Sequence, residues 1–272
     1  MTAEETAKRD LLAGLTRLGI DEISVRKGQR YLTVVVDHDS GRLVWAHPGR
    51  DRATVEKFLD LLGEERCERI TLVSCDMADW ITGPIGERCP NAEVCYDPFH
   101  LVKLATDALD EVRREVWNDA RRAGQTVLAK ELKGARFALW KNPDRLTERQ
   151  KLKLAQIQQT NKPLFRAYLL CQQLRMIYRV GCEHALALLD AWLAWARRCR
   201  LHPFVKLAKT ITKQRAGIEA ALRHGLSNAP VEQVNTQIRL ITRRGFGYHS
   251  PWAVIALAML SLGGLCPPLP GR

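Results

Sequence analysis

The first hundred residues alternate between apolar runs of strand length and short polar turns. Three runs rich in β-branched and aliphatic residues come first, at residues 18–25, 31–36 and 43–46. The segments between them, 26–30 and 38–41, carry glycine and other turn-forming residues. Strands joined by such tight connections predict an antiparallel meander. A short helical leader is expected before them, over residues 1–16.

The hydrophobic period changes after the third strand. Ala53, Phe58, Leu59 and Leu62 share one helical face, which Gly63 ends. A nearly continuous apolar run at 70–75 then predicts a strand buried on both faces. A short helix over 80–88 and a fifth strand over 93–96 follow. A meander that continues into strand–helix–strand units predicts a mixed α/β sheet with helices on its faces.

The pattern from His100 to about Gly225 is helical throughout. The segment is rich in Ala, Leu, Arg, Glu and Lys, and its apolar stripes are typical of core packing. A later helix over 226–248 has Val231, Val234 and Ile238 on one face, and a last helix follows Ser250-Pro251. The expected organisation is a leader at 1–17, an α/β domain formed by 18–101 and 226–272, and a helical insertion at 102–225.

Composition narrows the function classes. The net charge of +12 favours a polyanionic partner, nucleic acid above all, although a basic protein without such a partner has the same charge. The cysteines are scattered, with no C-x-x-C pair for zinc, and they are typical of buried thiols in a reducing cytosol. The apolar stretch 253–265 is too short to span a bilayer. We therefore expect a cytoplasmic protein without a membrane partner and, because it has no glycine-rich phosphate loop, without a nucleotide cofactor.

Three acidic residues lie where a fold of this class would bring them together. Asp21 is in the first strand, Asp76 ends the buried fourth strand, and Glu232 is in the first turn of a late helix. Each has an ordinary alternative: a solvated strand residue, a helix cap and a favourable charge at a helix start. Their convergence would suit Mg²⁺, which prefers oxygen ligands. Glu22 is expected on the opposite face of its strand.

The late helix also offers a basic surface. Asn235, Arg239 and Arg243 follow Glu232 at helical spacing and fall on its side of the helix. The adjoining segment 242–249 combines Arg243 and Arg244 with glycines and aromatic residues. A solvated polar face is the alternative, but this combination favours contact with DNA phosphates.

An acid and an imidazole stand three residues apart where the fifth strand gives way to a helix. Asp97 and His100 are secondary candidates for the site, since a cap for the helix and a locally packed histidine are the more common roles of such residues.

Several motifs together resemble those of DDE transposases of bacterial insertion sequences, and in particular the ISL3 family. They cover nearly the whole chain from residue 18 onward, and they lie at 19–23, 30–37, 49–51, 76–80, 89–92, 97–100, 109–114, 228–235 and 243–247.

The resemblance implies a ribonuclease H-like domain split by the helical insertion, and DNA strand cleavage and strand transfer as the activity. It assigns the catalytic, metal-binding triad to Asp21, Asp76 and Glu232, with two Mg²⁺ or Mn²⁺ ions. Transposon ends and target DNA are the implied partners, bound by a homo-oligomer. Asp97 and His100 match an acid-x-x-histidine signature found after the second aspartate in related transposases.

One departure from the family pattern leaves other functions open. Family members usually begin with a zinc-binding segment and a helix-turn-helix, whereas about 17 residues precede the expected catalytic fold here. A truncated, non-catalytic remnant that binds DNA is therefore the main alternative, and a structure-specific nuclease on the same fold is a third.

Overall fold

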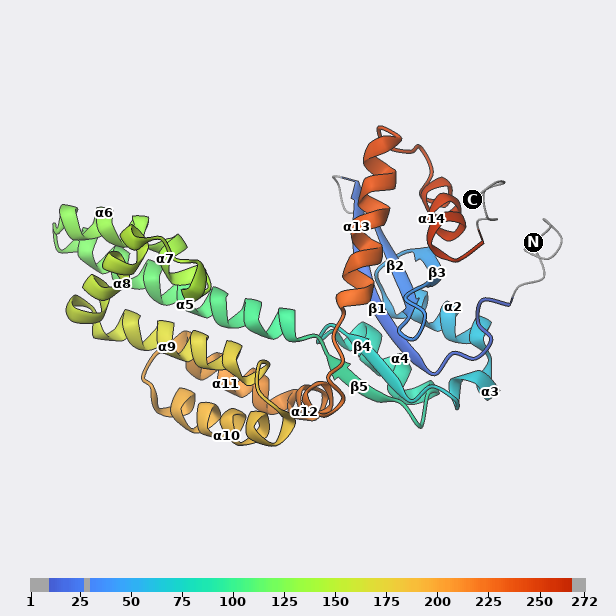
Figure 1. Cartoon of the computed structure of the whole chain (residues 1–272), viewed down its shortest axis with the longest axis horizontal. Helices are drawn as coiled ribbons and strands as arrows, with labels where there is room; N and C mark the ends of the chain where they lie inside the picture. The colour runs from blue at the N-terminus through green and yellow to red at the C-terminus, as the bar shows by residue number, and fades with distance from the viewer. Residues whose placement is uncertain (1–9, 27–29, 266–272) are drawn as a thin grey trace. The chain divides into compact units, whose positions relative to one another are not determined.

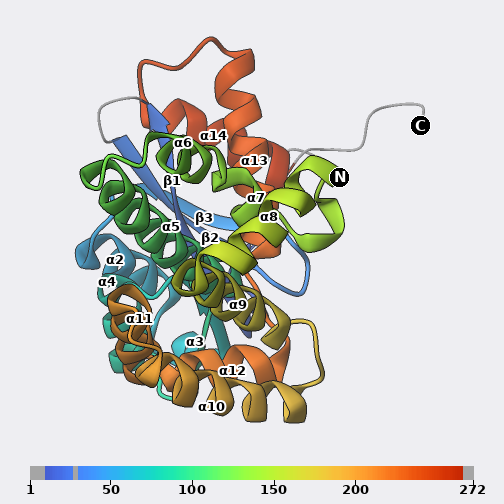
Figure 2. The same ribbon diagram turned by 90° about the vertical axis from the view of Figure 1, so that its left-hand side faces the viewer.

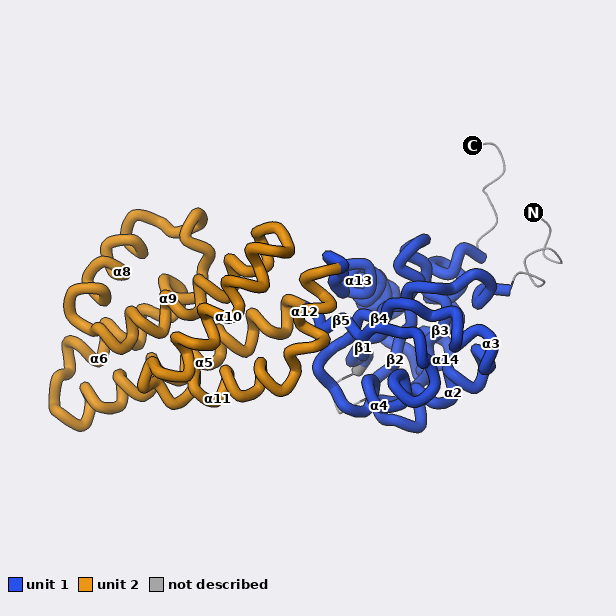
Figure 3. The backbone as a smooth tube through the Cα atoms, turned by 90° about the horizontal axis from the view of Figure 1, so that it is seen from below, with its two compact units in different colours: residues 1–97, 224–272 blue, residues 98–223 orange. Residues whose placement is uncertain are grey.

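The computed structural model describes residues 10–26 and 30–265 and divides into two compact units. Unit 1 combines residues 1–97 with 224–272, and unit 2 consists of residues 98–223 (Figure 3). Within the described ranges, no helix has both the length and the apolar character needed to cross a bilayer. Most of the expected leader, and residues 27–29 of the turn expected at 26–30, lie outside the described residues, while residues 11–14 form a turn.

Unit 1 is built on a five-stranded mixed sheet in the order β3-β2-β1-β4-β5. Its strands are β1 (Arg17–Arg26), β2 (Arg30–Asp37), β3 (Leu43–Pro48), β4 (Leu72–Cys75) and β5 (Glu93–Tyr96). The β1–β2 and β2–β3 pairs are antiparallel, and the β1–β4 and β4–β5 pairs are parallel. This topology confirms the expected ribonuclease H-like mixed sheet.

One face of the sheet is covered by α2 (Arg52–Leu62), α3 (Glu64–Cys67) and α4 (Asp79–Arg88). Ile20 from β1 and Val73 from β4 belong to a buried core with Phe58 of α2 and Ile81 of α4. The Asp51 carboxylate caps α2 by accepting the Thr54 N–H at 2.8 Å. The four-residue α3 was not predicted, because one helical turn is too short to show a period.

The opposite face is covered by α13 (Ala229–Arg244) and α14 (Pro251–Leu262). Val231, Val234 and Ile238 of α13 are buried together with Ile23 of β1 and Val34 of β2. Figure 1 shows α13 running along β1, although some 200 residues separate the two elements in the chain. The predicted apolar stripe of this late helix is therefore the stripe that packs on the sheet.

Gly19 allows α13 to lie close to β1. A Cβ atom at this position would overlap the Val231 side chain and would lie 3.0 Å from Nε2 of His38 and 3.3 Å from Oγ of Ser74. Those neighbours belong to α13, to the turn after β2 and to β4. A side chain at residue 19 would therefore push the helix away from the sheet.

Unit 2 is entirely helical within its described residues. Its elements are α5 (Pro98–Arg122), α6 (Thr126–Gly134), α7 (Arg136–Trp140), η1 (Pro143–Arg145), α8 (Glu148–Thr160), α9 (Lys162–Ile177), α10 (Cys182–Arg198), α11 (His202–Lys213) and α12 (Arg215–His224). Figure 2 gives a second view of these helices. The Trp192 ring is fully buried and its Nε1–H donates to the Leu170 carbonyl at 2.8 Å, so this tryptophan belongs to the core of unit 2.

Replacing Gly19 by alanine should destabilise unit 1 by about 1–3 kcal/mol, since a methyl group would be forced into a filled space. Gly86→Ala in α4 is the matched control, because nothing lies within 4 Å of a Cβ at that position. Alanine there should stabilise the helix by about 0.5–1 kcal/mol. Urea unfolding of both variants measures the difference, and equal stability of the two would contradict the close packing described for Gly19.

Candidate active site

The alternation of side chains along the parallel strands sends several polar groups toward α13. Asp21 follows Gly19 by two residues on β1, and Asp76 follows Ser74 by two residues at the end of β4. Asp97 comes directly after β5. The register pairs Gly19 with Ser74 and Cys75 with Tyr96, so Asp21, Asp76 and Asp97 gather at the edge of the parallel strands where β4 and β5 end.

The carboxylates of Asp21 and Asp76 lie near each other at this edge. One carboxylate oxygen from each of Asp21, Glu22 and Asp76 lies within 4.8 Å of the other two. All three side chains are half-buried. The structure thus brings together two of the three acids singled out by the sequence, from strands more than fifty residues apart.

Hydrogen bonds fix the orientation of the Asp21 carboxylate. Its Oδ1 accepts the backbone N–H of Glu22 at 2.8 Å, and its Oδ2 accepts the side-chain amide of Asn235 at 2.8 Å. Asn235 is only 2 % exposed. The sequence placed Asn235 on the DNA-facing surface, but its buried amide instead contacts the acidic group.

Asp76 does not cap the helix that follows it. The N-cap of α4 is Ala78, and that cap has no side-chain hydrogen bond. The backbone carbonyl of Asp76 accepts the Ala78 N–H at 2.8 Å, which turns the chain away from β4. The capping alternative for Asp76 is therefore wrong, and the carboxylate points toward its acidic neighbours.

Glu22 is closer to the site than its place in the strand predicted. Side chains alternate between the two faces along a strand, so Glu22 should point the same way as Leu18 and Ile20, which pack on the face opposite α13. The pairing of β1 with β4 ends at Gly19, however, so at residue 22 no neighbouring strand separates the two faces on that side. Glu22 also pairs with Arg50 at 2.9 Å.

Glu232 is exposed in the first turn of α13. Asn228, four residues earlier, donates its backbone N–H to Asp97 at 3.2 Å. Asn235, three residues later, donates to Asp21. Residues at these spacings share one side of a helix, so Glu232 lies between the residues that contact Asp97 and Asp21. Among the described residues, the close carboxylate groups do not include Glu232, and its place in a triad stays a prediction.

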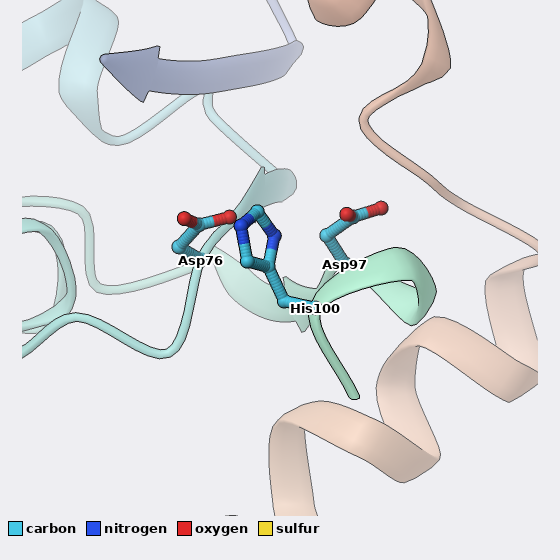
Figure 4. A group of neighbouring side chains, drawn as sticks. All are labelled: Asp76, Asp97 and His100. Carbon is cyan, nitrogen blue, oxygen red and sulfur yellow. The ribbon is translucent and has the colours of Figure 1, made fainter. Parts of the chain in front are cut away.

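Asp97 is buried beside the same edge. It is 4 % exposed, and one of its carboxylate oxygens lies within 4.8 Å of one from Asp76. Figure 4 draws these two carboxylates together with His100, which stands in the first turn of α5, three residues after Asp97.

A buried polar chain that the sequence did not reveal supports the start of α13. The Ser74 hydroxyl donates its one proton to the side-chain carbonyl of Asn228. In the 2.6 Å contact between Ser74 Oγ and His38 Nε2, the serine oxygen therefore accepts and the imidazole Nε2–H donates. Ser74 and Asn228 are at most 1 % exposed. Nothing in the local sequence connects residues from a turn, a strand and a distant helix.

The arginines predicted to bind DNA lie on the exposed side of α13. Arg239, Arg243 and Arg244 are all exposed, and within residues 10–26 and 30–265 none of them forms an ion pair. Exposed guanidinium groups without acidic partners are available to phosphates. The helix therefore presents the Asn235 amide to Asp21 and positive charge to solvent.

The acidic edge has the donors that a divalent metal requires. Three carboxylates this close repel one another, and a cation between them offsets that repulsion. Mg²⁺ binds oxygen at 2.0–2.1 Å, so two ligand oxygens on opposite sides of one ion are at most about 4.2 Å apart. The separations of up to 4.8 Å are near that limit, so small side-chain rotations would suffice. The acidic edge, defined by Asp21, Glu22 and Asp76, fits a divalent cation.

Comparison with known proteins gives consistent results. The model of a family described as transposase, of the DDE type of ISL3 elements, matches residues 18–257. The chain is 54 % identical to the transposase for insertion sequence element IS1557 from two strains of Mycobacterium tuberculosis, over 98 % of this chain and 65 % of theirs. It is 32 % identical to the transposase for IS1001 of Bordetella parapertussis, over 85 % of this chain and 57 % of that protein. The chain thus spans less than two thirds of these relatives' lengths.

The stability of unit 1 should fall when the pH drops below about 6.5, in part because of His38. Burial, and secondarily Arg17, hold the pKa of His38 below its ordinary value of 6.5, against the opposing charges of Asp37 and Asp39. His38 therefore binds a proton more readily in the unfolded chain than in the folded chain, so acid favours unfolding.

Comparing thermal unfolding at pH 7.5 and 5.5 tests this contribution. His38→Gln should lose less stability than the wild type over that interval, whereas His249→Gln, at an exposed position, should behave like the wild type. An unchanged pH dependence in His38→Gln would contradict the assignment.

Proposed function

Because the chain belongs to the ISL3 family of DDE transposases, we propose that it cleaves DNA strands and joins them to target DNA at the acidic edge. The proposal assigns the catalytic roles to Asp21, Asp76 and Glu232. The observation that supports it most is the approach of Asp21, Asp76 and Glu22 to within 4.8 Å in a strongly basic chain. An acidic cluster of that kind is unfavourable beside DNA phosphates unless cations intervene.

Asp21 and Asp76 would hold the metal, with Glu232 as the third acid. Two Mg²⁺ or Mn²⁺ ions bound there would supply Lewis-acid stabilisation to the attacking and leaving oxygens of an in-line displacement. The protein's own contribution is to hold the ligands in place before DNA arrives. Asn235 orients Asp21, and the chain of His38, Ser74 and Asn228 secures the start of the helix that carries Glu232.

The DNA would lie along the exposed side of α13. Arg239, Arg243 and Arg244 would contact phosphates, since each is exposed and lacks an ion-pair partner among the described residues. Such contacts position the backbone and carry no sequence information. The bound DNA would be a transposon end or a target site, with copies of the chain assembled on it.

Nicking of supercoiled plasmid DNA that carries the ends of the encoding element tests the catalytic assignment. The wild-type chain should nick it in Mg²⁺ or Mn²⁺ and not in EDTA. Asp76→Asn and Glu232→Gln should each lower the rate by about a hundredfold or more, the scale of losing one preorganised charged group. Glu68→Gln, at an exposed position in unit 1, is the matched control and should keep the wild-type rate.

Equal nicking by the wild type and Asp76→Asn would contradict the site. Loss in Asp76→Asn with full activity in Glu232→Gln would remove Glu232 from the triad. A wild-type chain that binds the plasmid and never nicks it, with either metal, would favour the non-catalytic DNA-binding alternative.

Asn235→Ala should slow nicking about 10- to 100-fold and raise the Mg²⁺ concentration needed for half-maximal rate. The reason is that the amide orients a ligand rather than the DNA. Gln237→Ala, at an exposed position on the same helix, should leave both quantities unchanged. A slower Asn235→Ala with an unchanged metal requirement would count against the orienting role.

A further inference from the structure

Phe246 is the most exposed large apolar side chain that the structure describes. It follows the end of α13 by two residues, and its exposed fraction is 100 %. A phenylalanine makes a large favourable contribution to stability only when its ring is buried. The exposed ring of Phe246 therefore makes no such contribution to the stability of the fold.

The backbone holds this ring outward in a conformation that disfavours it. Phe246 has φ of +52°, a left-handed conformation that glycine and asparagine adopt far more readily than a bulky residue. The turn is nevertheless well defined: the Phe246 N–H donates to the Arg243 carbonyl at 3.1 Å, and the Gly247 N–H donates to that of Thr242 at 2.9 Å. A strained residue kept in an ordered turn is typical of a functional position.

The neighbouring side chains reinforce the turn. The Tyr248 ring folds back so close to Gly245 that a Cβ at residue 245 would overlap it, and Tyr248 itself packs on the buried core beneath α13 and α14. The turn is therefore anchored on one side and presents Phe246 on the other.

The surroundings of Phe246 suit a nucleobase. A hollow of about 290 Å³ lies beside the ring, lined also by Val25, Gly247, Tyr248 and His249. Arg243 and Arg244 stand exposed immediately before it. An aromatic face, a hollow and unpaired arginines together are the features with which proteins hold a base that has left the stack.

We propose that Phe246 stacks on an unpaired DNA base and so holds DNA open near the acidic edge. This inference rests on the proposed function for its partner, DNA. Asn235 contacts Asp21 at the acidic edge, and Arg244 ends α13 nine residues later. The two residues are therefore about 14 Å apart along the helix axis. At 3.4 Å per nucleotide the stacked base lies about four nucleotides or more from the reacting phosphate.

Binding to two fluorescein-labelled 24-base-pair duplexes of one sequence tests the proposal, one blunt and one with a four-base unpaired tail. Fluorescence anisotropy in EDTA measures Kd without cleavage. The wild type should prefer the tailed duplex by about 5- to 100-fold, the effect of stacking one base. Phe246→Ala should abolish that preference and bind the blunt duplex as the wild type does, while Phe246→Trp should keep it.

Three further variants separate stacking from other roles. Leu61→Ala, at a position 59 % exposed on α2, is the matched control and should keep the preference. The double variant Arg243→Gln, Arg244→Gln should weaken binding to both duplexes alike and reduce its salt dependence. Phe246→Asn should lose the preference while its melting temperature rises, because asparagine relieves the left-handed strain.

A preference retained in Phe246→Ala would overturn the proposal, and so would a lowered melting temperature in Phe246→Asn, which would make the ring a structural element. If Phe246→Ala keeps the preference but no longer self-associates in sedimentation, Phe246 belongs instead to a contact surface for a second copy of the chain. A wild type that binds neither duplex contradicts DNA as the partner altogether. A wild type that binds both equally contradicts only the stacking role, and it leaves metal-dependent nicking untouched.

Discussion

The packing of α13 directly on β1 is the constraint on which unit 1 depends. It requires glycine at residue 19, where any side chain would meet Val231. The close approach lets Asn235 reach Asp21 and lets Asn228 reach Ser74 and, through its backbone, Asp97. Moving the helix outward by the width of one methyl group would break the hydrogen bonds at the start of α13 and in its second turn. The missing side chain of Gly19 thus sets the geometry of an acidic group formed by residues distant in the sequence.

The strands and the order of elements were predictable because their patterns are local. The apolar runs of β1, β2, β4 and β5 lie between turn-forming residues, and the observed bounds differ from the predicted ones by a residue or two at most ends. The apolar stripe on α13 likewise identified the face that packs on the sheet.

What could not be predicted depends on contacts between distant segments. Glu22 reaches the acidic edge only because the β1–β4 pairing stops at Gly19, and no pattern in β1 reveals where its neighbour ends. The helical spacing predicted Asn235 on the same surface as the arginines, but the residue is buried against β1 and contacts Asp21, while the arginines are exposed. The bond between Ser74 and Asn228 joins residues more than 150 positions apart. Sequence periodicity carries no information about such pairs.

The side chains of α13 combine three kinds of surface on one helix. Its apolar stripe holds it to the sheet, its Asn235 amide contacts the carboxylate of Asp21, and its arginines face solvent. In a chain of net charge +12, that arrangement separates a small negative site from the positive surface that would attract DNA. A catalytic triad at this edge therefore requires Glu232, on this same helix, to complete the site.

Local cleavage of the polypeptide by bound iron tests that claim most directly. Fe²⁺ would replace Mg²⁺ at the acidic edge, and ascorbate with peroxide would then generate radicals that cut the backbone close to the ion. Cuts are expected near residues 21, 76 and 232, and they should be suppressed by excess Mg²⁺ and absent in Asp76→Asn. Cuts near 21 and 76 with none near 232, or cuts that Mg²⁺ does not suppress, would contradict that claim.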